Sequence, residues 1–371
     1  MHYKNVCLES LGYVLPSEIV TSDELETRLS PLYERLRLPE GRLEMMTGIR
    51  ERRFWPSGTM PSDVSQQSGE LALQAAGFDA AGIGALVHGS VCRDHLEPAT
   101  ACRVHWLMGL PSHCVVYDVS NACLGMINGV LQLANMIELG QVDAGLVVGT
   151  EDARPLVENT IATLNSDKSL TRQSVKSAIA SLTIGSASCA MLLVHRRLSR
   201  FGNRLVGAAT RSETDHHRLC QSLTDQAGGA MRPLMSTDSQ GLMQQGIATG
   251  MATFVDFFHQ IGWKPGTLDR TICHQVGTAH RQQMLESLEL DIDADFSTFP
   301  WLGNTGSVAL PITLAKAAES GFLVRGNQLA LLGIGSGINC IMLGIDWQDA
   351  AISGQTWDTE KTTALPQAII S

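Results

Sequence analysis

The sequence predicts an α/β protein built from two similar halves. Short apolar runs rich in β-branched residues alternate with longer runs of helical periodicity. The stretches from Cys123 to Gly140 and from Asn304 to Gly321 are equally long, and each contains a turn, a helical pattern and a glycine stop, with an apolar strand following. We therefore expect duplicated α/β halves, in which buried and largely parallel strands lie between helices.

The strands are expected where short apolar runs end at glycine or polar residues. In chain order these runs are Val6–Leu15, Ala85–Cys92, Cys114–Val119, Ala144–Gly149, Ala187–His195, Leu205–Arg211, Thr271–Gln275, Gln328–Ile334 and Asn339–Asp346. Helices are expected where apolar residues recur every three or four positions. These segments are Ser22–Arg35, Asp63–Ala76, Thr100–Met108, Leu124–Leu139, Leu242–Ile261, Ala279–Leu288 and Ile312–Gly321.

The repeat also suggests how the chain is divided. We expect a first half over residues 1–200, a second half over 201–347, and a C-terminal tail over 348–371. The tail is polar and mostly without pattern, which indicates either a mobile terminus or an arm packed onto the body.

Two stretches do not fit the alternation. Residues 153–184 form a long connection with a helical part at Arg172–Leu182, and residues 212–240 are polar and contain Met231 and Met235. Such excursions in a compact enzyme are usually lids, channel walls or interface arms. The methionines could line a channel for an apolar ligand or simply fill core.

The composition limits the possible functions. The chain has 371 residues, is 44% hydrophobic and carries a net charge of −10, which disfavours nucleic acid as a partner. Its nine cysteines are scattered without a Cys-x-x-Cys pair, so we expect reduced thiols, no metal site and a cytoplasmic protein. No apolar signal core opens the chain, and no run is long enough for an integral membrane segment.

Cys123 is the first candidate catalytic residue. It lies between the strand Cys114–Val119 and the helix Leu124–Leu139. The N-terminus of a helix has unpaired N–H groups and a partial positive charge, which would lower the pKa of a nearby thiol. This position predicts a nucleophile that forms an acyl-enzyme. The alternative is that Cys123 is one more small buried apolar residue.

His274 and Asn304 are the next candidates. His274 stands near the end of the strand Thr271–Gln275, and Asn304 lies in a glycine-flanked turn before a helix. Taken alone, His274 would be assigned as a buried structural histidine, and Asn304 as a turn or helix-cap asparagine. The duplication changes this interpretation, because it places Asn304 opposite Cys123 and brings the His274 strand to the same site.

These motifs resemble those of a known family. Asn-Ala-Cys-Leu-Gly at 121–125, His-Gln at 274–275 and Gly-Asn-Thr-Gly-Ser at 303–307 resemble the Cys-His-Asn set of thiolase-fold condensing enzymes. Their order is that of the ketoacyl-ACP synthase III branch, and residues 333–337 resemble its C-terminal glycine turn. The resemblance extends to about Trp347. It implies a thiolase fold with α-β-α-β-α layers, a homodimer, and acyl-CoA or acyl-ACP substrates without a further cofactor.

The resemblance also implies a role for each site residue. Cys123 would take an acyl group from a thioester, and its backbone N–H, with one from the Ser336 region, would stabilise the oxyanion at the acyl-cysteine. His274 and Asn304 would donate hydrogen bonds to the thioester oxygen of the second substrate as that substrate becomes an enolate.

Two departures narrow the choice within the family. Degradative thiolases carry a second cysteine just before the C-terminal glycine turn, where this chain has Leu332. Ketoacyl synthase III enzymes normally read His-Gln-Ala-Asn, whereas residues 274–277 read His-Gln-Val-Gly. Neither a two-cysteine thiolase nor a chain-initiating synthase is therefore favoured.

A loop over residues 91–101 instead resembles that of OleA-type acyl-CoA condensing enzymes of bacterial olefin synthesis. In that family a glutamate on this loop enters the active site of the partner subunit, and Glu97 holds the matching position. Condensing two unactivated acyl thioesters requires a base for the α-proton, which Glu97 would supply. The alternative is a solvated loop carboxylate.

We therefore expect non-decarboxylative Claisen condensation of two fatty acyl-CoAs to a 2-alkyl-3-oxoacyl product. A decarboxylating 3-oxoacyl-ACP synthase III that uses a malonyl thioester is the main alternative, together with an acyltransferase of specialised metabolism. A catalytically silent partner subunit of a biosynthetic assembly is the non-enzymatic alternative.

Overall fold

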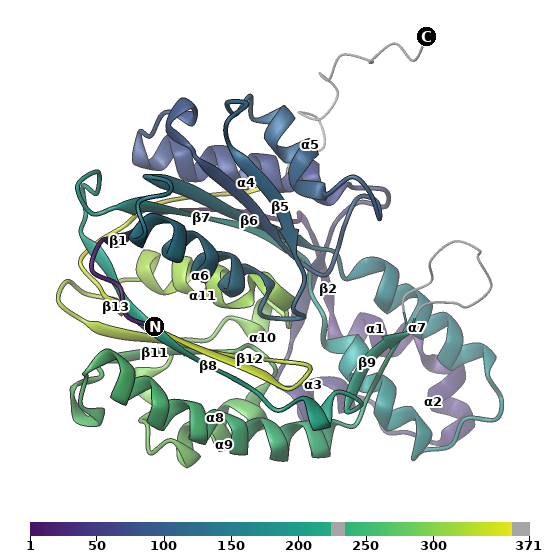
Figure 1. The fold of residues 1–371 in the computed structure, drawn as a ribbon. Helices are drawn as coiled ribbons and strands as arrows, with labels where there is room; N and C mark the ends of the chain where they lie inside the picture. Colours follow the sequence, from purple (N-terminus) through teal and green to yellow (C-terminus); the bar gives the residue numbers. More distant parts are fainter. Residues whose placement is uncertain (224–233, 358–371) are drawn as a thin grey trace, which may run out of the picture.

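The computed structural model describes residues 1–223 and 234–357. One continuous sheet passes through both halves of the chain (Figure 1). In sheet order its strands are β11 (Arg270–Cys273), β12 (Gln328–Gly335), β13 (Asn339–Asp346), β8 (Asn203–Ser212), β1 (Val6–Leu15), β7 (Ala187–His195), β6 (Ala144–Glu151), β4 (Ala85–Gly89) and β5 (Val115–Val119). The order is nearly symmetric about the junction of β8 and β1, as expected for two duplicated halves.

The helices complete five layers. They are α1 (Ser22–Arg28), α2 (Ser30–Leu36), α3 (Arg42–Thr47), α4 (Pro61–Ala76), α5 (Thr100–Leu107), α6 (Gly125–Glu138), α7 (Arg154–Ser166), α8 (Ser239–Ile261), α9 (Thr278–Ser287), α10 (Phe299–Leu302) and α11 (Ala309–Glu319). Figure 1 shows α6 and α11 between the two half-sheets, where their apolar residues share one core, with α4 and α5 on one outer face and α8 and α9 on the other. The α-β-α-β-α expectation is confirmed.

The expectation of largely parallel strands is wrong. β4 pairs in parallel with β5 and β6, and β11 pairs in parallel with β12, but β12–β13, β13–β8, β8–β1, β1–β7 and β7–β6 are antiparallel. The glycine turn after β12 is too short for a crossover, so β13 must return antiparallel. Helices nevertheless cover both faces, and this is why the antiparallel strands are also continuously apolar.

The two middle helices end in the same way. Gly140 and Gly321 follow α6 and α11 with φ of 70° and 75°, a conformation that glycine adopts without strain. Their N–H groups donate to the carbonyls of Ile137 and Ala318 at 3.0 and 3.1 Å. This is the glycine stop of the sequence repeat.

The first excursion is more helical than expected. It forms α7 and a 3₁₀ segment, η2 (Ser174–Thr183), where the sequence predicted only one helix near its end. Their apolar residues pack with those of α1, α2 and α3 in a separate small core. The single helix expected over Ser22–Arg35 is divided at Leu29, before Pro31, because proline lacks the N–H that a continuous helix would need.

The second excursion forms a hairpin. Strands β9 (Cys220–Leu223) and β10 (Leu234–Thr237) pair antiparallel, and the Met235 carbonyl accepts a hydrogen bond from Ser181 Oγ of η2 at 3.3 Å. Met231 lies outside the described residues. The hairpin β2 (Glu18–Thr21) and β3 (Glu51–Phe54) forms the other small sheet.

Part of the tail is an ordered strand. Strand β14 (Ala351–Thr356) pairs in parallel with Ser10–Leu15 of β1. Trp357 follows it and meets the Trp55 ring edge-on at 5.7 Å between centroids. Residues 351–357 are therefore an arm packed onto the body, one of the two alternatives that the sequence left open for the tail, and residues 358–371 lie outside the described part. All nine cysteines are free, and no described helix could cross a membrane.

Candidate active site

Cys123 lies at the turn that the sequence predicts. Only Leu124 separates it from Gly125, the first residue of α6. Ala122, just before it, has a φ of 44°, which is unusual for a residue with a Cβ. Gly125 packs so tightly that an added Cβ would lie 3.1 Å from the carbonyl carbon of Gly89. The turn therefore holds the thiol in a fixed position at the start of a buried helix.

The electrostatic expectation for this thiol is wrong. Burial raises the pKa of Cys123 to about 12, and the charges of Glu151 and Cys220 act in the same direction, while a backbone hydrogen bond opposes them. Desolvation of a thiolate therefore outweighs the stabilising effect of the helix end. At neutral pH Cys123 is therefore a thiol, and it would have to give up its proton in order to act as a nucleophile.

His274 follows β11 directly and is buried, with 4% of its surface exposed. Its backbone N–H donates to the Leu332 carbonyl at 3.0 Å, which fixes it to β12. Burial lowers the pKa of His274 to about 3, with His280 as a further cause. At neutral pH the imidazole is uncharged, so it can donate a hydrogen bond from one ring nitrogen without contributing a full positive charge.

The amide of Asn304 is oriented by its own turn. Its Oδ1 accepts a hydrogen bond from the Gly306 N–H at 3.0 Å, which leaves the NH₂ group as the donor for a ligand. The Asn304 backbone is tied to the first half, because its N–H donates to the Thr183 carbonyl and its carbonyl accepts from the Gly185 N–H, both at 2.9 Å. This orientation suits the stabilisation of an oxyanion.

The turn that carries Ser336 lies against the turn that carries Cys123. A Cβ added to Gly335 would lie 3.5 Å from the Cys123 backbone nitrogen. The Asn339 amide bridges the two turns, donating to Asn121 Oδ1 at 2.9 Å and to the Ser336 carbonyl at 3.3 Å. The two backbone segments predicted for the oxyanion hole are therefore neighbours.

The turn that carries Asn304 also meets the first half near Cys123. The Ser307 hydroxyl lies 2.9 Å from the Gly89 carbonyl and 2.5 Å from Glu151 Oε1, and its single proton is shared between these two acceptors. Gly89 packs on the start of α6, and the Glu151 charge acts on Cys123. Together with the β11–β12 pairing that holds His274, these contacts gather the predicted segments at one end of the sheet.

Glu97 is not gathered with them in the single chain. It is exposed on the loop between β4 and α5, and no hydrogen bond or ion pair joins its side chain to a described residue. The loop itself is anchored, because Asp94 accepts from the Ser62 N–H at 3.0 Å and Arg93 pairs with Asp118 at 3.3 Å.

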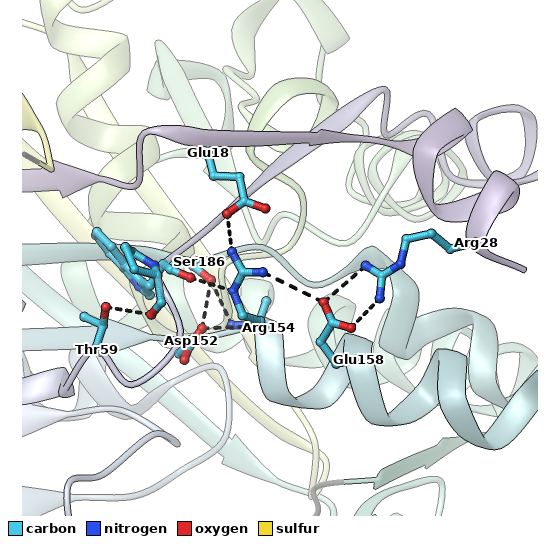
Figure 2. A network of polar contacts seen from close by, with 10 residues as sticks. Glu18, Arg28, Thr59, Asp152, Arg154, Glu158 and Ser186 are labelled. Atoms are coloured by element: carbon cyan, nitrogen blue, oxygen red, sulfur yellow. Dashed lines mark hydrogen bonds and ion pairs between the residues drawn. The ribbon is translucent and has the colours of Figure 1, made fainter. Parts of the chain in front are cut away.

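The sequence interpretation missed Glu151 and Asp152, which stand at the end of β6. Burial raises the pKa of Asp152 to about 6. Figure 2 shows Asp152 beside Ser186 and Arg154, whose guanidinium continues the polar network toward α1. Two consecutive carboxylates at the end of an apolar strand were the available signal. No group of His, Cys, Asp or Glu side chains in the described ranges could hold a metal ion.

Comparison with known proteins identifies the family. The N-terminal domain of thiolase matches residues 44–196, and the C-terminal domain of 3-oxoacyl-[acyl-carrier-protein] synthase III matches residues 258–347. An acyl-CoA:acyl-CoA alkyltransferase of Shewanella oneidensis is 43% identical over 94% of this chain and 100% of its own length. One from Xanthomonas campestris is 35% identical, with 94% and 100% covered.

Solved structures of related proteins agree with this family assignment. A crystal structure of a cysteine variant of Xanthomonas campestris OleA superposes with a TM-score of 0.88 at 35% identity, covering 94% of this chain and 98% of that one. Another, with bound lauric acid and lauroyl-CoA, has a TM-score of 0.87 and covers 93% and 100%. The thiolase fold is thereby confirmed, and the chain belongs to the OleA-like acyl-CoA:acyl-CoA alkyltransferases of the thiolase superfamily.

Proposed function

We propose that the protein condenses two fatty acyl-CoAs head to head, without decarboxylation, to a 2-alkyl-3-oxoacyl product. The observation that carries this proposal is the full-length similarity to acyl-CoA:acyl-CoA alkyltransferases, at 43% identity in one case. The complete set of Cys123, His274 and Asn304, on segments that meet at one end of the sheet, supports it.

In the first step the Cys123 sulfur attacks the thioester carbonyl of one acyl-CoA. A bond forms between sulfur and the acyl carbon, the bond to the coenzyme A sulfur breaks, and coenzyme A leaves as a thiol with the proton that Cys123 gives up. The backbone N–H groups of Cys123 and Ser336 stabilise the oxyanion that forms transiently.

In the second step a base removes an α-proton from the second acyl-CoA. Glu97 of the partner subunit is this base, and His274 and Asn304 donate hydrogen bonds to the enolate oxygen. The α-carbon attacks the acyl-cysteine, a carbon–carbon bond forms, and Cys123 leaves and regains a proton. A neutral His274 suits this step, since its N–H can donate without a permanent charge that would trap the enolate.

The assignment of Glu97 as the base is supported by a comparison with the solved OleA structures. Solved structures of Xanthomonas campestris OleA include variants of one cysteine and one glutamate. In that chain the two residues are separated by the same number of positions as Glu97 and Cys123 here. The exposure of Glu97 in the single chain fits a side chain that acts in a second protomer.

The same proposal includes a cytoplasmic homodimer that works in lipid biosynthesis, takes acyl groups from coenzyme A or acyl carrier protein, and needs no further cofactor. Light scattering of the purified protein tests the dimer. Parallel assays with lauroyl-CoA and lauroyl-ACP test the carrier.

The decisive experiment supplies lauroyl-CoA alone. We expect free coenzyme A and a β-keto product, and we expect Glu97→Ala to abolish condensation while Cys123 acylation stays detectable by intact mass. His95→Ala, an exposed residue on the same loop, is the matched control and should retain condensation.

Two other outcomes identify the alternatives. Strict dependence on malonyl-CoA would favour the decarboxylating synthase, whose family model matches residues 258–347. Failure of Cys123 to gain acyl mass from any thioester would favour a silent partner subunit.

A further inference from the structure

Glu151 is a buried carboxylate that joins two segments of the site. It is the last residue of β6 and only 5% exposed. Its Oε1 accepts hydrogen bonds from the Val91 N–H at 3.1 Å, the Ser307 N–H at 3.2 Å and Ser307 Oγ at 2.5 Å. Val91 begins the loop that carries Glu97, and Ser307 belongs to the turn that carries Asn304. A buried carboxylate with three donors is an effective anchor for both segments.

The contact continues from Glu151 to the Asn304 amide. A Cβ added to Gly306 would lie 3.1 Å from Glu151 Cδ, so this part of the turn rests directly on the carboxylate. The Gly306 N–H then donates to Asn304 Oδ1 at 3.0 Å. The direction in which the Asn304 NH₂ group points therefore depends on where Glu151 holds residues 306 and 307.

Glu151 also acts electrostatically on the Cys123 thiol. Its charge is one cause of the raised pKa of Cys123. Its backbone carbonyl accepts a hydrogen bond from the Trp55 indole N–H at 2.9 Å, which fixes the end of β6. The carboxylate thus supports the turn that carries Asn304 from a strand end that is itself held in place.

We propose that Glu151 is a positioning residue for condensation, the acceptor that sets the Asn304 amide relative to the Cys123 acyl group. The inference rests on the proposed function. Glu151 acts through Gly306 and Ser307 and does not touch the substrate. Acylation of Cys123 does not use the Asn304 amide, whereas condensation does, so the two half-reactions separate the role of Glu151 from a general loss of structure.

The test measures both half-reactions with lauroyl-CoA, following acylation by intact mass and condensation by product formation. We expect Glu151→Ala to acylate Cys123 within about threefold of the wild-type rate but to condense about 10 to 100 times more slowly, as for a catalytic group displaced by about 1 Å. Glu151→Gln should regain most of the condensation rate, because its amide oxygen accepts the same donors.

Glu138→Ala is the matched control. Glu138 also accepts hydrogen bonds from backbone N–H groups, those of Lys4 and Asn5, but it lies at the far end of α6. It should change neither half-reaction. Thermal unfolding of each variant verifies folding. Ser307→Ala, which removes the hydroxyl contacts to Glu151 and to the Gly89 carbonyl but keeps the Ser307 N–H bond to Glu151, replaces Glu151→Ala if that variant does not fold. Ser307→Ala should slow condensation severalfold and leave acylation intact.

Three results would overturn the assignment: condensation by Glu151→Ala at the wild-type rate, equal loss of acylation and condensation, or no recovery with Glu151→Gln. An unchanged condensation rate in Ser307→Ala would do the same if that variant is the one tested. A wild-type protein that acylates but never condenses would instead refute the proposed function, so the two failures are distinguishable.

Discussion

The turn with Cys123, residues 121–125, and the turn with Asn304, residues 303–307, occupy equivalent places in the two halves and differ in what they present. Leu124 alone separates Cys123 from α6, whereas the 3₁₀ segment η6 (Gly306–Val308) separates Asn304 from α11. The first turn therefore presents a side chain at a helix end. The second turn uses its extra length to bond the Asn304 side-chain oxygen, Oδ1, to its own Gly306 N–H, which leaves the NH₂ group to be presented.

The backbones of the two turns differ as well. The first places Ala122 at a φ of 44°, while the second uses glycine at both of its positive angles, 68° at Gly303 and 56° at Gly306. The first turn accepts the strain of a Cβ in this region. A Cβ at 306 would crowd the Glu151 side chain and would be strained at this positive φ, so the second turn uses glycine there. One duplicated scaffold thus presents a thiol on one side and an amide donor on the other.

The largest expected effect comes from removing the functional group of each turn. Cys123→Ala should abolish both acyl mass and product, because no covalent intermediate can form. Asn304→Ala should still acquire the acyl group but condense about 10² to 10³ times more slowly, the usual loss for one oxyanion donor. Intact mass and product assays with lauroyl-CoA check both variants.

A loss of acylation in Asn304→Ala would contradict the division of labour between the turns. Cys102→Ala, a partly buried cysteine of α5, is the control for loss of a thiol and should leave both reactions unchanged.

The next effect concerns the resting state of the thiol. The pKa of Cys123 is raised to about 12, so its thiolate fraction should rise about tenfold per pH unit through neutral and mildly alkaline pH. Alkylation of Cys123 by iodoacetamide, followed by peptide mass spectrometry, should show this slope without a plateau between pH 7 and 9. A plateau near neutral pH would mean that the helix end outweighs burial after all.

The same alkylation assay on Glu151→Gln tests how much the Glu151 charge contributes to the raised pKa of Cys123. Removing the charge of Glu151 should lower the Cys123 pKa and so speed alkylation at a given pH, since this carboxylate is one cause of the upward shift. An unchanged rate would contradict this contribution of the Glu151 charge and attribute the shift to desolvation without it.

The smallest effect is on stability. Gly306→Ala should destabilise the fold by about 1 to 3 kcal/mol, because it combines a positive φ with a contact of 3.1 Å to Glu151. Ala122→Gly should stay within about 1 kcal/mol of the wild type, since relief of strain offsets the added chain entropy. Chemical denaturation measures both, and a larger loss in Ala122→Gly than in Gly306→Ala would reverse the comparison.

Much of the architecture could be predicted from local patterns. The strand Val6–Leu15 was predicted to the residue, and the glycine stops at Gly140 and Gly321 correctly located the ends of the two middle helices. The prediction of largely parallel strands was wrong because a continuously apolar strand shows only that helices cover both of its faces. It does not show whether the neighbouring strand runs parallel or antiparallel. The strand Ala351–Thr356 was missed because it is stabilised by pairing with β1, a contact distant in sequence.

The sequence by itself determined the nucleophile turn, the repeat that pairs it with the Asn304 turn, and the His274 strand, because each depends on residues that are close together in the chain. Only the tertiary structure decided the protonation of Cys123, the neutral state of His274 and the anchoring by Glu151. Desolvation and hydrogen bonds between the halves depend on what surrounds a side chain in space, and no local pattern contains that information.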